Sequence, residues 1–303
     1  MPSRKSLLIT GGSGFIGSAL VRRLAGEGHG VTLLVSPWFD ESRLADLAGA
    51  YRVFRDPDAA VAFADPDVIY HLASTPFHPA SRRAHEHYDA IVTRTVALLD
   101  AARARRGVRF VFTGSCAEYG EGSRLREDSA AIPGTVLGAA KLAATNAVLA
   151  WARWFGMEAV VLRLFTPYGP GEAPGRLIPH LVRSLERGAE VALSGDGMQQ
   201  RDYVYLGDVV EALVAAALQT VACAGGGQHL IGRGISARDV AATVGKAMGV
   251  EPVISKFRTG AVRRDHADVG RQSARRGVTW LAATGEFRGR DRADGRVVAL
   301  ESA

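Results

Sequence analysis

A glycine-rich segment near the start of the chain has the spacing of a phosphate-binding loop. Gly11, Gly14 and Gly17 directly follow a short apolar run at residues 6–10. Glycines in this pattern permit a tight turn, let backbone approach a pyrophosphate and let the next helix pack closely on the strand. The helix N-terminus would offer N–H groups and partial positive charge to the phosphates. The segment predicts a dinucleotide site, the alternative being a glycine-rich turn without a ligand.

The elements that would hold this loop alternate along the first half of the chain. Short apolar runs typical of buried strands alternate with segments of helical spacing. We therefore expect an α/β protein whose parallel sheet is doubly wound and Rossmann-like, with helices on both faces. The expected strands are residues 6–10, 30–35, 51–54, 68–72, 109–113 and 159–164, and the expected helices are 16–25, 43–48, 87–103 and 141–155.

The second half of the chain differs in its Gly and Pro content and in the order of its expected elements. Gly and Pro cluster at residues 167–175, where we expect a loop. Helical spacing follows at residues 177–187, 206–217 and 236–249, with a short strand at 190–193. We expect a dinucleotide-binding domain at 1–166, to which later elements return, a mainly substrate-binding region at 167–283, and an atypical Arg-dense tail at 284–303.

Composition excludes several classes of protein. The chain is 47% hydrophobic and 22% charged, as in ordinary globular proteins. Two cysteines are too few for a disulfide framework, and no signal-peptide or membrane-spanning pattern is evident, so we expect a cytoplasmic protein. Half of the net charge of +6 lies at residues 263–276. This charge fits an anionic ligand, and without zinc-finger spacing, RNP motif or basic helix we expect neither a metal nor nucleic acid.

The glycine spacing and a series of later segments together resemble the extended short-chain dehydrogenase/reductases. Within them, the match is to the NAD-dependent epimerase/dehydratase family of nucleotide-sugar enzymes. The matching segments, in order, are Asp56, His71-Leu72-Ala73, TGSCAEYG at 113–120, GAAK at 138–141, RLFTPYGPG at 163–171 and RDYVY at 201–205. The resemblance implies a nicotinamide cofactor, a nucleotide-sugar substrate and a homodimer formed through the helices at 87–103 and 141–155.

The resemblance also assigns residues to the cofactor. They are Gly11, Gly14, Phe15, Ile16, Gly17, Ser36, Asp56, Leu72, Ala73, Lys141 and Pro167. Asp56 would contact the adenine amino group, and Leu72 and Ala73 would lie along the cofactor. An acidic residue at the end of the second strand would grip the ribose 2′-hydroxyl of NAD. Val35 and Ser36 stand there instead, so the sequence favours NADP over NAD and leaves both open.

The catalytic pattern of the family is incomplete. Members use a Tyr four residues before a Lys, with a Ser or Thr at the end of the fifth strand, to move a proton while hydride passes to or from the nicotinamide. Lys141 and Ser115 match, but Leu137 stands in the tyrosine position. One hypothesis is another proton donor, namely Tyr119, Cys116, Glu118 or a water held by Lys141. A second is a different or reduced step, and a third is a cofactor-binding protein with weak or no turnover.

Two details refine these hypotheses. Glu118 is expected to face solvent, and Tyr119 is retained with Ser115 and Lys141 as a candidate catalytic residue. Dehydratases of the family carry acids where Cys116 and Ala117 stand here, which argues against a 4,6-dehydratase.

The substrate end is expected to be basic. By resemblance, Arg201 and Arg264, or its neighbour Arg263, would bind the diphosphate, with Thr166 and Arg176 nearby. A guanidinium suits phosphate because it donates two parallel hydrogen bonds. The sequence thus predicts a 4-ketoreductase or C4 epimerase acting on a nucleotide-diphosphate (6-deoxy)hexose.

Overall fold

The protein is built on a seven-stranded sheet. The computed structural model describes residues 4–75, 83–122, 125–126, 128–218, 234–257 and 278–282. The strand order is β13-β6-β5-β4-β1-β2-β3. Six strands are parallel, namely β1 (Ser6–Thr10), β2 (Gly30–Leu34), β3 (Tyr51–Phe54), β4 (Val68–His71), β5 (Arg109–Ser115) and β6 (Glu158–Leu164), and β13 (Val278–Ala282) runs antiparallel to β6. Strands 1 to 6 have the Rossmann order, which confirms the predicted fold class.

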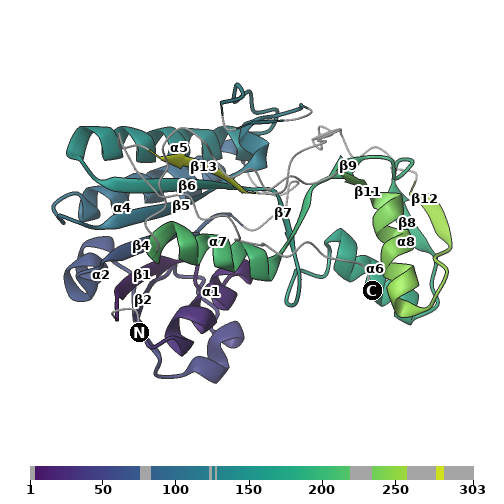
Figure 1. Cartoon of the computed structure of the whole chain (residues 1–303), viewed down its shortest axis with the longest axis horizontal. Helices are drawn as coiled ribbons and strands as arrows, with labels where there is room; N and C mark the ends of the chain where they lie inside the picture. Colours follow the sequence, from purple (N-terminus) through teal and green to yellow (C-terminus); the bar gives the residue numbers. More distant parts are fainter. Residues whose placement is uncertain are drawn as a thin grey trace, which may run out of the picture.

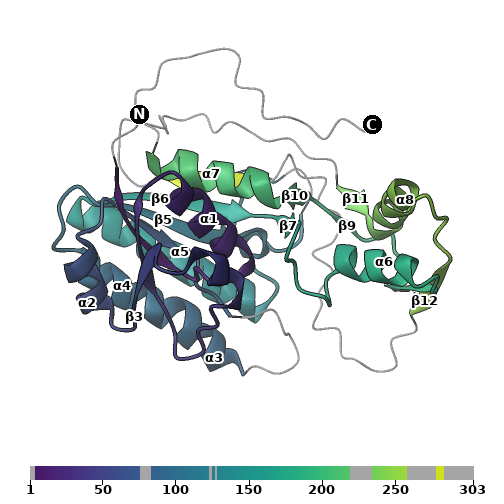
Figure 2. The same ribbon diagram turned by 90° about the horizontal axis from the view of Figure 1, so that it is seen from below.

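Helices cover both faces of the sheet (Figure 1). On one face α1 (Phe15–Gly26) packs against α7 (Leu206–Leu218), and on the other lie α2 (Pro57–Ala64), α4 (Arg94–Ala102) and α5 (Val136–Phe155). Figure 2 shows the same two layers from another side. Successive residues of β1 point into different cores, Leu7 and Ile9 into one and Leu8 into the other. Strands covered on both sides must be apolar throughout, which explains the uninterrupted apolar runs in the sequence.

The single helix predicted at residues 87–103 is wrong. The structure has α3 (Ala84–Tyr88), a π-helical turn η2 (Asp89–Thr93) and then α4. Just after the turn, Thr95 Oγ1 donates to the carbonyl of Ile91 at 2.5 Å and lies 2.8 Å from Nε2 of His71. Single π turns inside helices occur frequently at functional sites. The predicted helix at 43–48 is also tighter than expected, a 3₁₀ helix η1 (Ser42–Leu47).

A smaller lobe is built by the later part of the chain. Parallel pairing joins β7 (Thr166–Tyr168) to β10 (Tyr203–Tyr205) and β8 (Val191–Ser194) to β12 (Ile254–Phe257), and antiparallel pairing joins β9 (Gln200–Arg201) to β11 (Ile235–Ser236). Helices α6 (Leu177–Glu186) and α8 (Ala237–Met248) pack together beside these strands, to the right of the sheet in Figure 1. The chain returns to the main sheet with α7 and β13.

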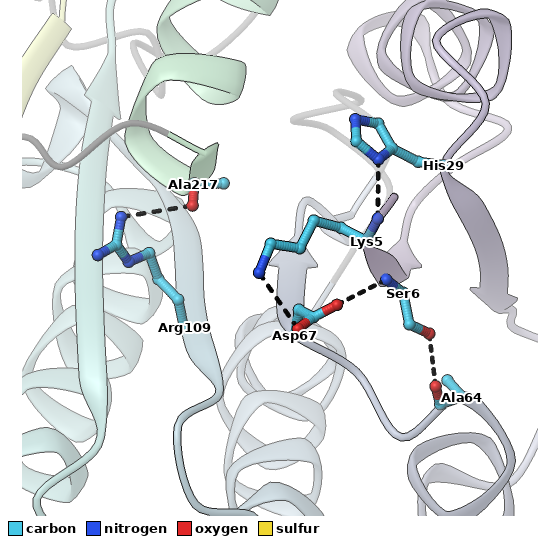
Figure 3. A network of polar contacts seen from close by, with 7 residues as sticks. All are labelled: Lys5, Ser6, His29, Ala64, Asp67, Arg109 and Ala217. Carbon is cyan, nitrogen blue, oxygen red and sulfur yellow. Dashed lines mark hydrogen bonds and ion pairs between the residues drawn. The ribbon is translucent and has the colours of Figure 1, made fainter. Parts of the chain in front are cut away.

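Polar contacts connect neighbouring segments at the edge of the sheet where the parallel strands begin (Figure 3). Asp67 accepts a hydrogen bond from the backbone N–H of Ser6 at 2.8 Å and forms an ion pair with Lys5 at 3.4 Å. Nearby, Arg109 Nη1 donates to the carbonyl of Ala217 at 3.3 Å, which joins β5 to α7. Ligands of doubly wound sheets bind at the opposite edge, beyond the carboxyl ends of the strands. These contacts therefore stabilise the fold, and the site lies at the other edge.

Candidate functional site

The glycine loop joins β1 to α1 in a conformation that only glycine allows at two positions. Gly11 has a φ of +70°, and a Cβ there would lie 2.8 Å from the backbone nitrogen of Ala73. A Cβ on Gly17 would lie 2.0 Å from the carbonyl oxygen of Gly11. Gly14 is the exposed N-cap of α1 and closes the turn by donating to Gly11 O at 3.0 Å. A glycine cradle before a helix N-terminus fits the pyrophosphate of a dinucleotide.

Other residues assigned to the cofactor surround this loop. Phe15 and Ile16 are half-buried against the core. The N–H of Leu72 donates to the carbonyl of Thr10, and that of Ala73 to the hydroxyl of Thr10 at 3.0 Å, so both residues follow β4 alongside the loop.

The positions expected at the adenosine end have clear structural roles. Asp56 is exposed and caps α2, accepting a hydrogen bond from the N–H of Ala59 at 2.8 Å. The carbonyl of Ser36 accepts from Phe39 in a turn directly after β2. Arg43, in η1, donates to the carbonyl of Gly171 at 2.7 Å. Its guanidinium thus contacts the loop that leads into the smaller lobe.

Lys141 is in α5, and its side chain reaches the end of β5, where reactive groups of this fold are expected. Its side chain is buried, Nζ donates to the carbonyl of Thr113 at 2.8 Å, and the ammonium lies 5.0 Å from the ring centre of Phe112. Burial lowers the pKa of Lys141 to about 8, although the negative charge of Glu118 acts to raise it. Close packing of α5 makes this position possible, because a Cβ on Gly138 would lie 2.3 Å from the carbonyl oxygen of Ala117.

A chain of hydrogen bonds connects the glycine loop to Lys141 through His71. Oγ1 of Thr10 is 2.6 Å from Nδ1 of His71, and Oγ1 of Thr95 is 2.8 Å from Nε2. The carbonyl of His71 accepts from Oγ1 of Thr113, whose own carbonyl accepts from Lys141. Burial, with repulsion from Lys141, lowers the pKa of His71 to about 3, so the ring is neutral. Sequence reasoning found His71 as part of a motif but missed this role.

Sequence reasoning placed Glu118 wrongly. It was expected to face solvent, but it is fully buried in η3 (Cys116–Glu118). Oε1 accepts the backbone N–H of Ser115 at 2.7 Å, and Oε2 accepts from Nε of Arg163 at 2.7 Å and from Oγ1 of Thr145 at 3.0 Å. A buried carboxylate needs such partners. The Ser-x-x-Glu spacing from Ser115 is a capping box, and that signal was readable in the sequence.

Ser115 and its neighbours differ in how accessible they are. Ser115 is half-buried, and its Oγ accepts the N–H of Ala117 at 3.2 Å. Tyr119 is only 2% exposed, and the guanidinium of Arg163 lies 4.6 Å from its ring centre. Burial raises the pKa of the Cys116 thiol to about 11, against the opposing effect of Arg201. Leu137, in the first turn of α5, is half-buried and packs against the core.

The expected substrate residues gather where the smaller lobe meets the sheet. Thr166 donates its N–H to the carbonyl of Asp202 at 3.0 Å, and Pro167 is paired with Val204 in the next strand. Arg176, at the N-cap of α6, donates from Nε to Glu172 at 3.3 Å.

Two of the predicted arginines act on one phenol. Burial raises the pKa of Tyr203, whereas Arg201 and Arg176 both lower it. Arg201, the predicted diphosphate ligand, and Arg176, which was expected nearby, thus act electrostatically on the same side chain. Arg263, Arg264 and the predicted tail at 284–303 lie outside the described residues.

Within the described ranges, no three His, Cys, Asp or Glu side chains are grouped so that they could hold a metal ion. In the same part of the chain, no helix has the length and apolar character needed to cross a bilayer.

Comparison with known proteins agrees with the geometry. The model of the NAD dependent epimerase/dehydratase family matches residues 7–232. The UDP-glucose 4-epimerase of Mycolicibacterium smegmatis is 30% identical over 86% of this chain and 89% of its own length. The dTDP-glucose 4,6-dehydratase of Streptomyces niveus is 32% identical over 68% of this chain and 67% of its own.

A solved structure extends the likeness to the fold. The complex of MoeE5 with UDP-glucose and NAD is 29% identical, has a TM-score of 0.71, and covers 90% of this chain and 94% of that one. The chain belongs to the NAD dependent epimerase/dehydratase family.

Proposed function

We propose that the protein is an NAD(P)-dependent enzyme that oxidises or reduces C4 of a nucleotide-diphosphate hexose, as a 4-ketoreductase or a C4 epimerase. The observation that carries this proposal is the hydrogen-bonded chain from the glycine loop through His71 to Lys141. It runs from the glycine loop after β1, across the end of β4, to the buried ammonium at the end of β5, and it supports a cofactor site beside this ammonium, with Ser115 two residues beyond the carbonyl that accepts from Lys141. UDP-glucose epimerases among the relatives support the same chemistry.

The glycine loop fits a nicotinamide dinucleotide, because it can turn this tightly only with glycine at positions 11 and 17, where a Cβ would collide with backbone, and because it leaves Gly14 exposed at the N-terminus of α1. When bound, the nicotinamide supplies the acceptor and donor of hydride. Gly14 and the first turn of α1 would hold the pyrophosphate, and Lys141 the nicotinamide ribose. Val35 and Ser36 lack the acid that grips the ribose 2′-hydroxyl of NAD, so we favour NADP, although MoeE5 is a complex with NAD. Parallel titrations of NADPH and NADH decide between the two, and clearly tighter NADH binding would reverse this preference.

The chain's own residues must handle the proton of the C4 oxygen without the tyrosine. Ser115 is proposed to donate a hydrogen bond to that oxygen. We propose that the proton moves between the C4 oxygen and Nζ of Lys141 through a water that Lys141 holds. A pKa of about 8 suits a group that must both give and take a proton near neutrality.

The other candidate donors are less suitable in this structure. Tyr119 is buried beneath Arg163, so its phenol is proposed to pack against this guanidinium instead of reaching substrate. Both oxygens of Glu118 already accept hydrogen bonds. The raised pKa of Cys116 keeps its thiol protonated at neutral pH and makes it a weak acid.

The substrate is proposed to be a nucleotide sugar whose diphosphate lies between Arg176 and Arg201. A panel of UDP-, dTDP-, GDP- and CDP-hexoses with NADPH or NADH tests the whole proposal. Arg201→Gln should raise KM for the active sugar at least about tenfold, since a charge-assisted contact is lost, and leave cofactor affinity unchanged. Arg187→Gln, on the exposed end of α6, serves as the control. Absence of any dinucleotide binding would refute the proposal.

Leu137 favours a second candidate function, a cofactor-binding protein with weak or no redox turnover. This candidate predicts the same cofactor affinity but no product from any sugar in the panel. Bound dinucleotide that co-purifies without turnover would support it.

We also propose a homodimer through α4 and α5, which lie side by side. Trp154, near the end of α5, is 84% exposed, and Phe155 beside it is also exposed. Light scattering of Trp154→Asp should show monomers if this face pairs two copies. Trp38→Asp, at an equally exposed tryptophan after β2, is the control and should leave the dimer intact.

A further inference from the structure

Glu118 and Arg163 form an ion pair from which solvent is excluded. The side chain of Glu118 is 0% exposed and that of Arg163 is 6% exposed. Gly114 makes the room for this arrangement, because a Cβ there would lie 2.5 Å from Oε1 of Glu118. Removing two charges from water is costly, and such a pair by itself is weak evidence for a stabilising role. Its position beside the proposed active site indicates another reason for it.

The carboxylate of Glu118 joins three elements around the proposed active site. It accepts hydrogen bonds from Ser115 at the end of β5, from Arg163 in β6 and from Thr145 in α5. Thr145 lies one helical turn beyond Lys141, so the carboxylate faces the same side of α5 as the lysine.

The carboxylate of Glu118 supplies negative charge to the surroundings of the Lys141 ammonium. From β4, His71 is neutral, and from β5 the ring of Phe112 and the carbonyl of Thr113 contact the ammonium. Glu118, from η3, is the negative charge that acts on Lys141, and on its other side it is paired with Arg163.

We propose that Glu118 is a positioning residue whose buried negative charge keeps the Lys141 ammonium protonated at neutral pH. This inference rests on the proposed function for its significance, because a deprotonated Lys141 would have no proton to give. Without Glu118, burial alone would act on the ammonium, and its pKa would fall further below the usual range of lysine.

Lysine NMR tests the inference without substrate, cofactor or turnover. The chain contains four lysines, Lys5, Lys141, Lys246 and Lys256, so a protein labelled with ¹³Cε-lysine gives four signals. Lys141→Arg identifies the signal of Lys141. In Glu118→Gln, the midpoint of its pH titration should fall by at least about one pH unit, to pH 7 or below, while the other three midpoints stay fixed. Glu121→Gln, an exposed carboxylate three residues further on, should change nothing.

A midpoint for Lys141 that is unchanged in Glu118→Gln would overturn the inference, as would an equal shift in Glu121→Gln. If Glu118→Gln does not fold, Glu118→Gln/Arg163→Gln removes both members of the pair, which proteins tolerate better than the loss of one. The midpoint is expected to fall in the double variant too, although by less than in the single variant, because loss of the Arg163 cation acts to raise it. An unchanged value there would overturn the inference equally. Because turnover is not measured, failure of the proposed enzyme activity leaves this test intact.

Discussion

Leu137 precedes Lys141 by one turn of α5, so the two side chains share one face of the helix. Leu137 packs against the core, whereas Lys141 reaches the carbonyl of Thr113 at the end of β5. In the family pattern, the position of Leu137 belongs to a tyrosine. On this resemblance, we infer that the protein keeps the lysine and its strand-end partner and has a hydrocarbon in place of the phenol.

Leu137→Tyr tests whether the proton donor has moved or has been lost. Assistance to proton transfer is worth about 10²–10⁴-fold. If Lys141 and its water carry the proton, the new phenol should raise kcat by less than about tenfold. Leu137→Phe, with the same ring and no hydroxyl, separates the acid from the change in volume. A gain of a hundredfold or more in the Tyr variant alone would instead support a site that has lost its donor.

The pH dependence of turnover should report Lys141. Its pKa is lowered to about 8, so the donor keeps its proton below this pH and loses it above. For reduction of a ketone, kcat/KM should be level up to pH 8 and then fall about tenfold per pH unit. Lys141→Arg stays protonated, so it should lose this limb and at least about 10² of the rate. The same alkaline limb in Lys141→Arg would exclude Lys141 as its origin.

The glycine loop predicts a sharp contrast between two substitutions in α1. Gly17→Ala places a Cβ 2.0 Å from the carbonyl oxygen of Gly11, so the helix must move away from β1. We expect NADPH binding to weaken at least about tenfold and thermal stability to fall, as expected for overpacking. Gly26→Ala, at the end of the same helix, meets nothing within 4 Å and should be stable, with unchanged affinity. Fluorescence titration and thermal melts measure both quantities.

The sequence predicted the fold well because the evidence for it is local. The strand at residues 6–10, the glycines after it and the helix that follows are fixed by apolar spacing and turn chemistry. The π turn at Asp89–Thr93 was not predictable in this way, since apolar spacing does not register where a helix is interrupted. The pairing of β13 with β6 was also missed, because pairing between distant segments leaves no local pattern.

The candidate site was predictable only in part for a related reason. Ser115 and Lys141 match the spacing of the family's motifs. In the structure, Ser115 ends β5 and the side chain of Lys141 reaches the same strand end. The burial of Glu118 depends on Arg163 and Thr145, which come from other elements 45 and 27 residues away. A charged side chain in a short segment is usually exposed, and only its partners in three dimensions reverse that expectation.

Acid should destabilise the protein partly through His71. Its pKa is about 3 in the folded protein and about 6.5 when unfolded, so between these values the unfolded chain binds a proton that the folded chain does not. The free energy of unfolding therefore falls as the pH decreases through this window. At pH 4.5, this one residue is expected to lower the free energy of unfolding by about 2–3 kcal/mol relative to pH 7.

His71→Gln isolates this contribution. Glutamine can hydrogen-bond towards Thr10 and Thr95 but has no basic nitrogen. Urea unfolding at pH 7 and at pH 4.5 should show that the variant loses about 2–3 kcal/mol less stability on acidification than the parent protein. His85→Gln, at an exposed histidine of α3, should lose as much as the parent. Equal losses in the parent and in His71→Gln would mean that His71 becomes protonated without unfolding, and the buried neutral ring would then not limit stability in acid.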